Sequence, residues 1–226
     1  MTFKKEFLKN KADLISVLEE RGFTVIWKVL DLRFAATKPL SEFLDLVLLL
    51  SPWVNGSFQA SLLIKVKNVG PFAGLEPVEK GEDGICVSSV DLNWLRINAE
   101  PEKKKQYEDD YVLKSDLGTQ RVLHDLDTVG FHYLESCVPL PKLAQFLLEI
   151  EAYPRKTKMG GEPVSADPFV YAAAIYILLG DVEKSKAALQ KGSVAFCKEK
   201  ATLQWQIARC ERFKISRKFL ETFFVD

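Results

Sequence analysis

Apolar residues recur at helical spacing at the start of the chain and again through its second half. Between Phe3 and Arg21 they form a single stripe, which predicts an amphipathic N-terminal helix. Gly22 follows this stripe, and glycine adopts the left-handed backbone of a helix end at little cost. Helical spacing returns at Asp116, and Asp167–Phe224 predicts three or four packed helices.

The region between these helices is rich in β-branched and aromatic residues. Strands are predicted over Thr24–Phe34, Leu44–Val54 and Phe58–Val66, and one or two more over Ile85–Ile97. Asn55-Gly56 joins two of them and is a strong hairpin signal, because both residues tolerate positive φ. Strands followed by helices predict an α+β fold, with an N-terminal helix plus an antiparallel sheet, followed by a C-terminal helical bundle.

The change from strands to helices predicts two regions. We expect residues 1–115 to form an α+β sheet region and residues 116–226 a helical region, packed together as one unit. The 226 residues, 47% of them hydrophobic and 27% charged, are enough for a sizeable core. No apolar run approaches the length of a membrane span, and charges follow the first residues closely, so we expect a cytoplasmic protein that does not enter a membrane.

The four cysteines lie far apart in the sequence and form no Cys-x-x-Cys pair. This spacing argues against a structural zinc site and against a dense disulfide scaffold. We therefore expect reduced thiols.

Basic and acidic residues number 31 each, but they are unevenly distributed. From Glu76 to Asp127 there are 13 acidic and 7 basic residues, and from Val182 to Lys218 there are 3 acidic and 10 basic residues. Two solvated faces are the simpler interpretation. The functional interpretation is an acidic partner-binding cluster at Glu108, Asp109 and Asp110, and a basic surface at Lys198, Arg209, Arg212 and Lys214.

The basic C-terminal helices also carry a rough apolar stripe, which includes Val194, Trp205 and Ala208. Single-stranded nucleic acid requires exposed aromatic side chains on which bases stack. Because this stripe is spaced as helical packing requires, we expect its residues in the core, beneath a basic outer surface.

Side chains that carry catalysis are scarce. The chain has two histidines and no Gly-x-Ser-x-Gly elbow, phosphate-binding loop or dinucleotide-binding glycine pattern. The best cluster is His124, Asp125 and Asp127, in which His124 and Asp127 share a helix face. A metal-dependent hydrolase that uses these residues is one interpretation, and the polar face of a helix is the other. We predict no catalytic residues, metal or cofactor, and favour a protein that is not an enzyme.

Tyr171–Leu189 contains three consecutive alanines that let two helices approach closely, and Leu179-Gly180-Asp181 makes the turn between them. This segment resembles one tetratricopeptide-type helical hairpin. A solenoid needs about three such repeats to bury its faces, and only one is clear. The segment therefore predicts a helical pair within the C-terminal bundle.

A wider pattern runs from Glu20–Phe23 and Trp27, through the hairpin at Asn55-Gly56, to Val129–Glu135 and the late helical pair. This pattern resembles a group of small uncharacterised bacterial α+β proteins. Some members of such groups are encoded beside polymorphic toxin genes and look like immunity proteins. The resemblance implies an interaction protein and carries no catalytic residues.

The sequence therefore predicts a non-enzymatic cytosolic protein-binding protein, an immunity protein that neutralises a bacterial toxin. Its partner would be a protein, with the acidic cluster facing a basic nuclease-type toxin. Two alternatives stay open: the metal-dependent hydrolase at His124, Asp125 and Asp127, and a nucleic-acid-associated protein that uses the basic C-terminal helices.

Overall fold

The computed structural model describes residues 12–27, 34–52, 57–67, 70–72, 74–75, 85–100, 111–112, 116–150, 167–196 and 204–224. Its contacts group the chain into two compact units. Unit 1 comprises residues 1–67 and 88–135, and unit 2 comprises residues 68–87 and 136–226. This division differs from the border expected at residue 115, because residues 116–135 cluster with the sheet rather than with the later helices.

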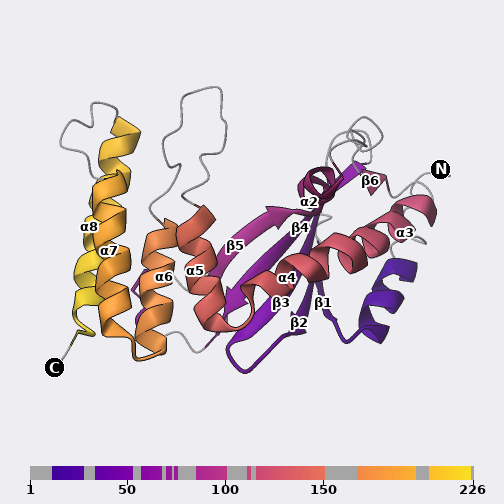
Figure 1. The fold of residues 1–226 in the computed structure, drawn as a ribbon. Coiled ribbons are helices and arrows are strands. Elements are labelled where there is room, and N and C mark those ends of the chain that lie inside the picture. The colour runs from indigo at the N-terminus through magenta and orange to yellow at the C-terminus, as the bar shows by residue number, and fades with distance from the viewer. Residues whose placement is uncertain are drawn as a thin grey trace. The chain divides into compact units, whose positions relative to one another are not determined.

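Six described strands form one sheet, and five of them follow the order β1-β2-β3-β4-β5 (Figure 1). The strands are β1 (Thr24–Trp27), β2 (Phe34–Pro39), β3 (Leu44–Pro52), β4 (Ser57–Val66), β5 (Ile85–Asp91) and β6 (Tyr111–Val112). Strands β1 to β4 pair antiparallel, each with the next along the chain, and β6 pairs antiparallel with β4. Pro52 lies opposite Phe58, so β3 and β4 are neighbours as predicted, and Asn55 and Gly56 lie outside the described residues.

The helices of unit 1 include two that cross one face of the sheet, α3 and α4 (Figure 1). Residues 12–20 are the described part of the N-terminal helix. The others are α2 (Leu92–Ala99), α3 (Asp116–Asp125), the π-helical segment η4 (Leu126–Gly130) and α4 (Phe131–Cys137). A Cβ added to Gly130 would lie 3.1 Å from the side chain of Leu62, so η4 packs directly on β4 at this glycine.

The core of unit 1 lies between these helices and one face of the sheet. Alternate side chains of β3 and β4 are buried there: Leu44, Leu46, Leu48, Leu50, Phe58, Ala60, Leu62, Ile64 and Val66. Leu14 and Leu18 of the N-terminal helix and Leu126 of η4 are fully buried as well. The described side chains between the buried positions of β3 and β4 are all at least partly exposed. The sheet therefore has one buried face and one open face.

Unit 2 is mostly helical. Its described helices are η2 (Gly70–Phe72), α5 (Leu140–Ile150), α6 (Asp167–Leu178), α7 (Val182–Phe196) and α8 (Gln204–Glu221). Helix α6 contacts η2, α5, α7 and α8, and its side chains from Phe169 to Tyr176 are all buried. The apolar composition of α6 therefore reflects its place among these four elements.

Two glycines with positive φ end helices, as the sequence predicts. Gly22 has φ +81°, and the amide of Phe23 donates to the carbonyl of Leu18. Gly180 has φ +73°, and the amide of Asp181 donates to the carbonyl of Tyr176. Both glycines close a helix with the backbone geometry that other residues adopt only at a cost.

Asp181 then starts helix α7. Its carboxylate accepts a hydrogen bond of 3.1 Å from the amide of Lys184, which is the usual N-cap arrangement. The Lys184 ammonium lies 2.6 Å from the same carboxylate. The hydrogen bond between the two side chains lowers the pKa of Asp181 and raises the pKa of Lys184.

The α+β class is confirmed, with an N-terminal helix, an antiparallel sheet and C-terminal helices. Two strand predictions are wrong in detail. Thr24–Phe34 contributes to two paired strands, β1 and β2, instead of one. Ile85–Ile97 changes from β5 to helix α2 at Leu92, which is fully buried, and Arg96 one turn later is buried as well. Burial of this helical face outweighs the alternation that suggested a strand.

Candidate functional site

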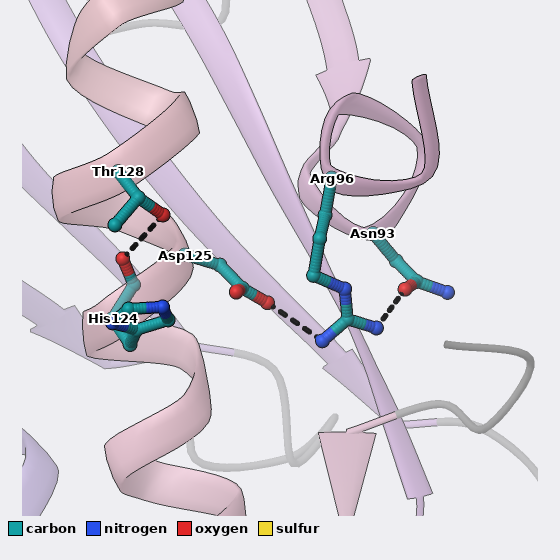
Figure 2. Close-up of polar contacts among 5 residues, drawn as sticks. All are labelled: Asn93, Arg96, His124, Asp125 and Thr128. Carbon is teal, nitrogen blue, oxygen red and sulfur yellow. Dashed lines mark hydrogen bonds and ion pairs between the residues drawn. The ribbon is translucent and has the colours of Figure 1, made fainter. Parts of the chain in front are cut away.

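A buried ion pair lies where the sequence suggested a metal-dependent hydrolase. Asp125, the last residue of α3, is 2% exposed, and its carboxylate accepts a hydrogen bond of 2.9 Å from Arg96 of α2. Arg96 is 4% exposed and also donates to the side-chain oxygen of Asn93 (Figure 2). Buried charges are tolerated when they are paired and hydrogen-bonded. The pair therefore joins α2 to α3 within unit 1.

His124 and Asp127 do not join this pair. Figure 2 shows the Asp125 side chain directed toward Arg96, whereas the exposed His124 side chain lies on another side of the helix. Asp127, in η4, forms an exposed ion pair of 2.6 Å with Arg21. The three residues proposed for a hydrolase are thus not brought together. Within the part of the chain that the structure describes, no group of three or more His, Cys, Asp or Glu side chains could hold a metal ion.

The charged clusters predicted from the sequence are only partly described. Glu108, Asp109, Asp110 and Lys198 lie outside the described residues. Arg209 belongs to α8, but its side chain is not among those described. Arg212 and Lys214 are exposed on α8, and Lys214 forms an ion pair of 2.8 Å with Glu211. The basic surface is therefore accompanied by acidic side chains of the same helix.

A groove lies between α7 and α8, entirely within unit 2. It encloses about 630 Å³ and is open to solvent. Its lining comes from both helices and the residues after α8: Glu183, Lys186, Ala187, Gln190, Arg217, Glu221 and Phe224. Figure 1 shows the two helices side by side. We call this cavity the α7–α8 groove.

Ion pairs hold the charged side chains of the α7–α8 groove. Lys186 lies 2.9 Å from Glu183, and its ammonium is 5.7 Å from the ring centre of Phe224. Arg217 lies 2.7 Å from Glu221 and donates a second hydrogen bond of 2.7 Å to the hydroxyl of Ser193. Two cations and two carboxylates line the groove, so their formal charges cancel.

Exposed aliphatic side chains continue the two faces that line the groove. Val194 lies seven residues after Ala187 on α7 and is 70% exposed. Ile207 lies fourteen residues before Glu221 on α8 and is 46% exposed. Spacings of seven and fourteen residues return to nearly the same side of a helix. Helices α7 and α8 run antiparallel, so the end of α7 lies beside the start of α8. Val194, near the end of α7, and Ile207, near the start of α8, therefore lie toward the same end of the groove.

The burial expected for the C-terminal apolar stripe is wrong at two described positions. Val194 and Ala208 are exposed, not buried. On α7 the buried positions are Ser185, Ala188, Leu189 and Gly192. The spacing of Val194 from Ala187 and Gln190 indicates that the three residues share one face of α7. It does not indicate whether that face is buried or exposed.

A scan against protein-family models and searches of curated proteins and of solved structures found no match to this chain. Among the described helices, none is long and apolar enough to cross a membrane.

The cysteines correct one further expectation. Cys210 takes part in a disulfide bond, so the expectation of reduced thiols is wrong for this residue. Cys86 is an exposed thiol and Cys137 is a buried one, while Cys197 lies outside the described residues. Disulfides persist mainly in oxidising compartments. The cytoplasmic location stays a prediction.

Alkylation of the native protein without reductant is expected to label Cys86 and to leave Cys137 unlabelled until the chain unfolds. Cys210 should become labelled only after a disulfide reductant is added, because a disulfide sulfur does not react with an alkylating agent. Peptide mapping by mass spectrometry measures all three. A Cys86→Ser variant is the control and should lose native labelling, whereas labelling of Cys210 before reduction would contradict the disulfide.

Proposed function

We propose that this protein is a non-enzymatic protein-binding protein whose α7–α8 groove holds a helix of its partner. The observation that carries the proposal is the exposure of Val194 and Ile207 at the end of a groove lined by paired charges. Amphipathic helices dock into grooves through apolar anchors spaced three, four or seven residues apart. Aliphatic residues beside the groove would accept such anchors.

The chemistry of the lining favours a protein over a small molecule or a nucleic acid. Small-molecule sites are mostly apolar and enclosed, whereas four of the seven lining residues here are charged and the cavity is open. Nucleic acid requires cations that are available to phosphates. Lys186, Arg217 and Lys214 each contact a carboxylate on the same helix. A partner helix with charges of both signs beside its apolar face matches this arrangement.

The partner that the sequence resemblance implies is a bacterial toxin, which would make this chain an immunity protein. The open α7–α8 groove and the scarcity of catalytic side chains agree with that role. Glu108, Asp109 and Asp110 would form a second contact, facing a basic toxin surface. An immunity protein needs no chemistry of its own, since covering about 800 Å² of the toxin is enough to block it.

Replacing Val194 by glutamate is expected to weaken partner binding by at least about tenfold, because the substitution places a charge where an apolar anchor would be desolvated. Tagged wild-type protein, purified from its native host, should carry one stoichiometric protein partner that mass spectrometry identifies. Where a neighbouring gene encodes a toxin, co-expression should rescue growth with the wild-type chain and fail with Val194→Glu.

The matched control is Ile215→Glu. Ile215 is 67% exposed on α8, and it precedes Arg217 by two residues, so it lies on the opposite side of the helix from the groove. This variant should bind as the wild type does. Equal loss of binding in both variants, or none in either, would contradict docking in the groove, and recovery of no partner at all would contradict the proposed function.

A further inference from the structure

The centre of the open face of the sheet in unit 1 carries no charged residue across four strands, and five of its eight side chains are apolar. The strand register places its central side chains in two rows, with Thr24, Thr37, Val47 and Leu63 in one and Ile26, Ala35, Leu49 and Ser61 in the other. None of these eight side chains is buried, and Ile26 is 55% exposed. Neither row contains a charged residue.

Charged residues of the open face lie at its ends. At one end Asp45 is opposite Lys65 in the register and forms an ion pair of 3.0 Å with Lys67. At the other end Gln59 donates a hydrogen bond of 2.7 Å to Asp91. A mainly apolar, uncharged centre with charged residues at its margins is the composition of a protein–protein interface.

The sequence of β3 also indicates that another layer covers the open face. Antiparallel sheets with one solvated face alternate apolar and polar residues, whereas strands covered on both faces have nearly continuous apolar runs. Residues Leu46 to Leu50 are all apolar, although only Leu46, Leu48 and Leu50 are buried. Val47 and Leu49 are thus typical of a face that another layer covers.

We propose that the open face packs against the same face of a second copy of this chain, in a twofold-symmetric dimer. Two identical sheets have the same twist, so they can pack face to face at the small angle that aligned sheets adopt. The chain has a formal net charge of zero, so two copies do not repel each other over a distance. A twofold interface uses one patch twice and needs no other protein.

The size of the open face sets the expected affinity. Four strands about 4.8 Å apart, each contributing about six residues of about 3.3 Å, give a footprint of roughly 400 Å² per copy. The two copies together would bury roughly 800 Å², which is below the size of a stable specific interface and in the range of weak, transient ones. We therefore expect a micromolar rather than a nanomolar dissociation constant.

Sedimentation velocity of the full chain tests the dimer, over concentrations from about 1 µM to about 200 µM. The wild-type chain should pass from monomer to dimer over this range. Leu49→Lys and Leu63→Lys should stay monomeric with unchanged circular dichroism, because each places two unpaired charges in the centre of the interface. The control is Phe43→Lys: Phe43 is 36% exposed in unit 1 but lies outside both rows, and this variant should dimerise as the wild type does.

Cross-linking provides a second test that does not depend on the lysine variants folding. In a Cys86→Ser background, chains carrying Ser61→Cys should be joined by a short bismaleimide linker, and chains carrying Phe43→Cys should not. A wild-type chain that stays monomeric would overturn the proposal, with the open face then left to another segment of this chain or to a different protein. A dimer that persists in both lysine variants would overturn it equally. Groove binding is separate, because Val194→Glu should still dimerise.

Discussion

Replacing Asp125 by alanine is expected to lower the free energy of unfolding by about 3–5 kcal/mol. The substitution leaves the guanidinium of Arg96 buried in unit 1 without the carboxylate that it contacts at 2.9 Å. A buried charge that loses its counter-charge keeps its desolvation cost and gives up the attraction that offset it. Urea denaturation followed by circular dichroism measures the change.

Asp127→Ala is the matched control, because Asp127 is also paired with an arginine and lies only two residues further along the same continuous helix. Its pair with Arg21 is exposed, so its loss should cost less than about 1 kcal/mol. Replacing both members of the buried pair, by Arg96→Met with Asp125→Leu, should restore most of the lost stability. If Asp125→Ala were no more destabilising than Asp127→Ala, the pair would not be buried as described.

Gly192→Val is expected to destabilise unit 2 by about 1–3 kcal/mol through overpacking. A Cβ at this position of α7 would lie 2.8 Å from the Cβ of Phe169 and 2.8 Å from the ring of Phe213. Both distances are shorter than a carbon–carbon contact allows, and Phe169 and Phe213 are buried. Helices α6 and α8 would have to move away from α7. Thermal unfolding of the variant measures the cost.

Gln190→Val is the control for Gly192→Val, because it introduces the same side chain into α7 at an exposed position. Gln190 is exposed two residues earlier on α7, so the same new side chain should change stability by no more than about 0.5 kcal/mol. Gly192→Ala should be milder than Gly192→Val, because alanine favours the helix by about 1 kcal/mol over glycine and offsets part of the clash. A Gly192→Val protein as stable as the wild type would show that the three helices do not approach this closely.

Some features of the fold have signals within a few residues of the chain. Gly22 and Gly180 both end helices at positive φ, where the sequence predicts a helix end and a turn. These features depend on backbone geometry within a few residues, and they can therefore be recognised without knowing the rest of the fold. The succession of strands and helices was visible for the same reason and determined the α+β class.

Contacts between residues that are distant in the sequence leave no local signal. Arg96 lies in a segment whose alternation predicts a strand, and nothing near it in the sequence indicates that it meets Asp125, 29 residues later. His124, Asp125 and Asp127 form a cluster only in the sequence, where they are neighbours. Their separation followed from the position of α3, which turns Asp125 inward and leaves His124 exposed.

The sequence by itself determined the helix ends at Gly22 and Gly180, the neighbouring strands β3 and β4, the fold class and which residues share a face of an element. The tertiary structure alone decided which of those faces are covered. Val194 and Leu189 are both apolar residues of α7, yet one is exposed at the groove and the other is buried. Val47 and Leu48 are neighbours in β3, yet only Leu48 is buried. The physical reason is that periodicity is a property of one segment, whereas burial depends on which distant segments pack against it.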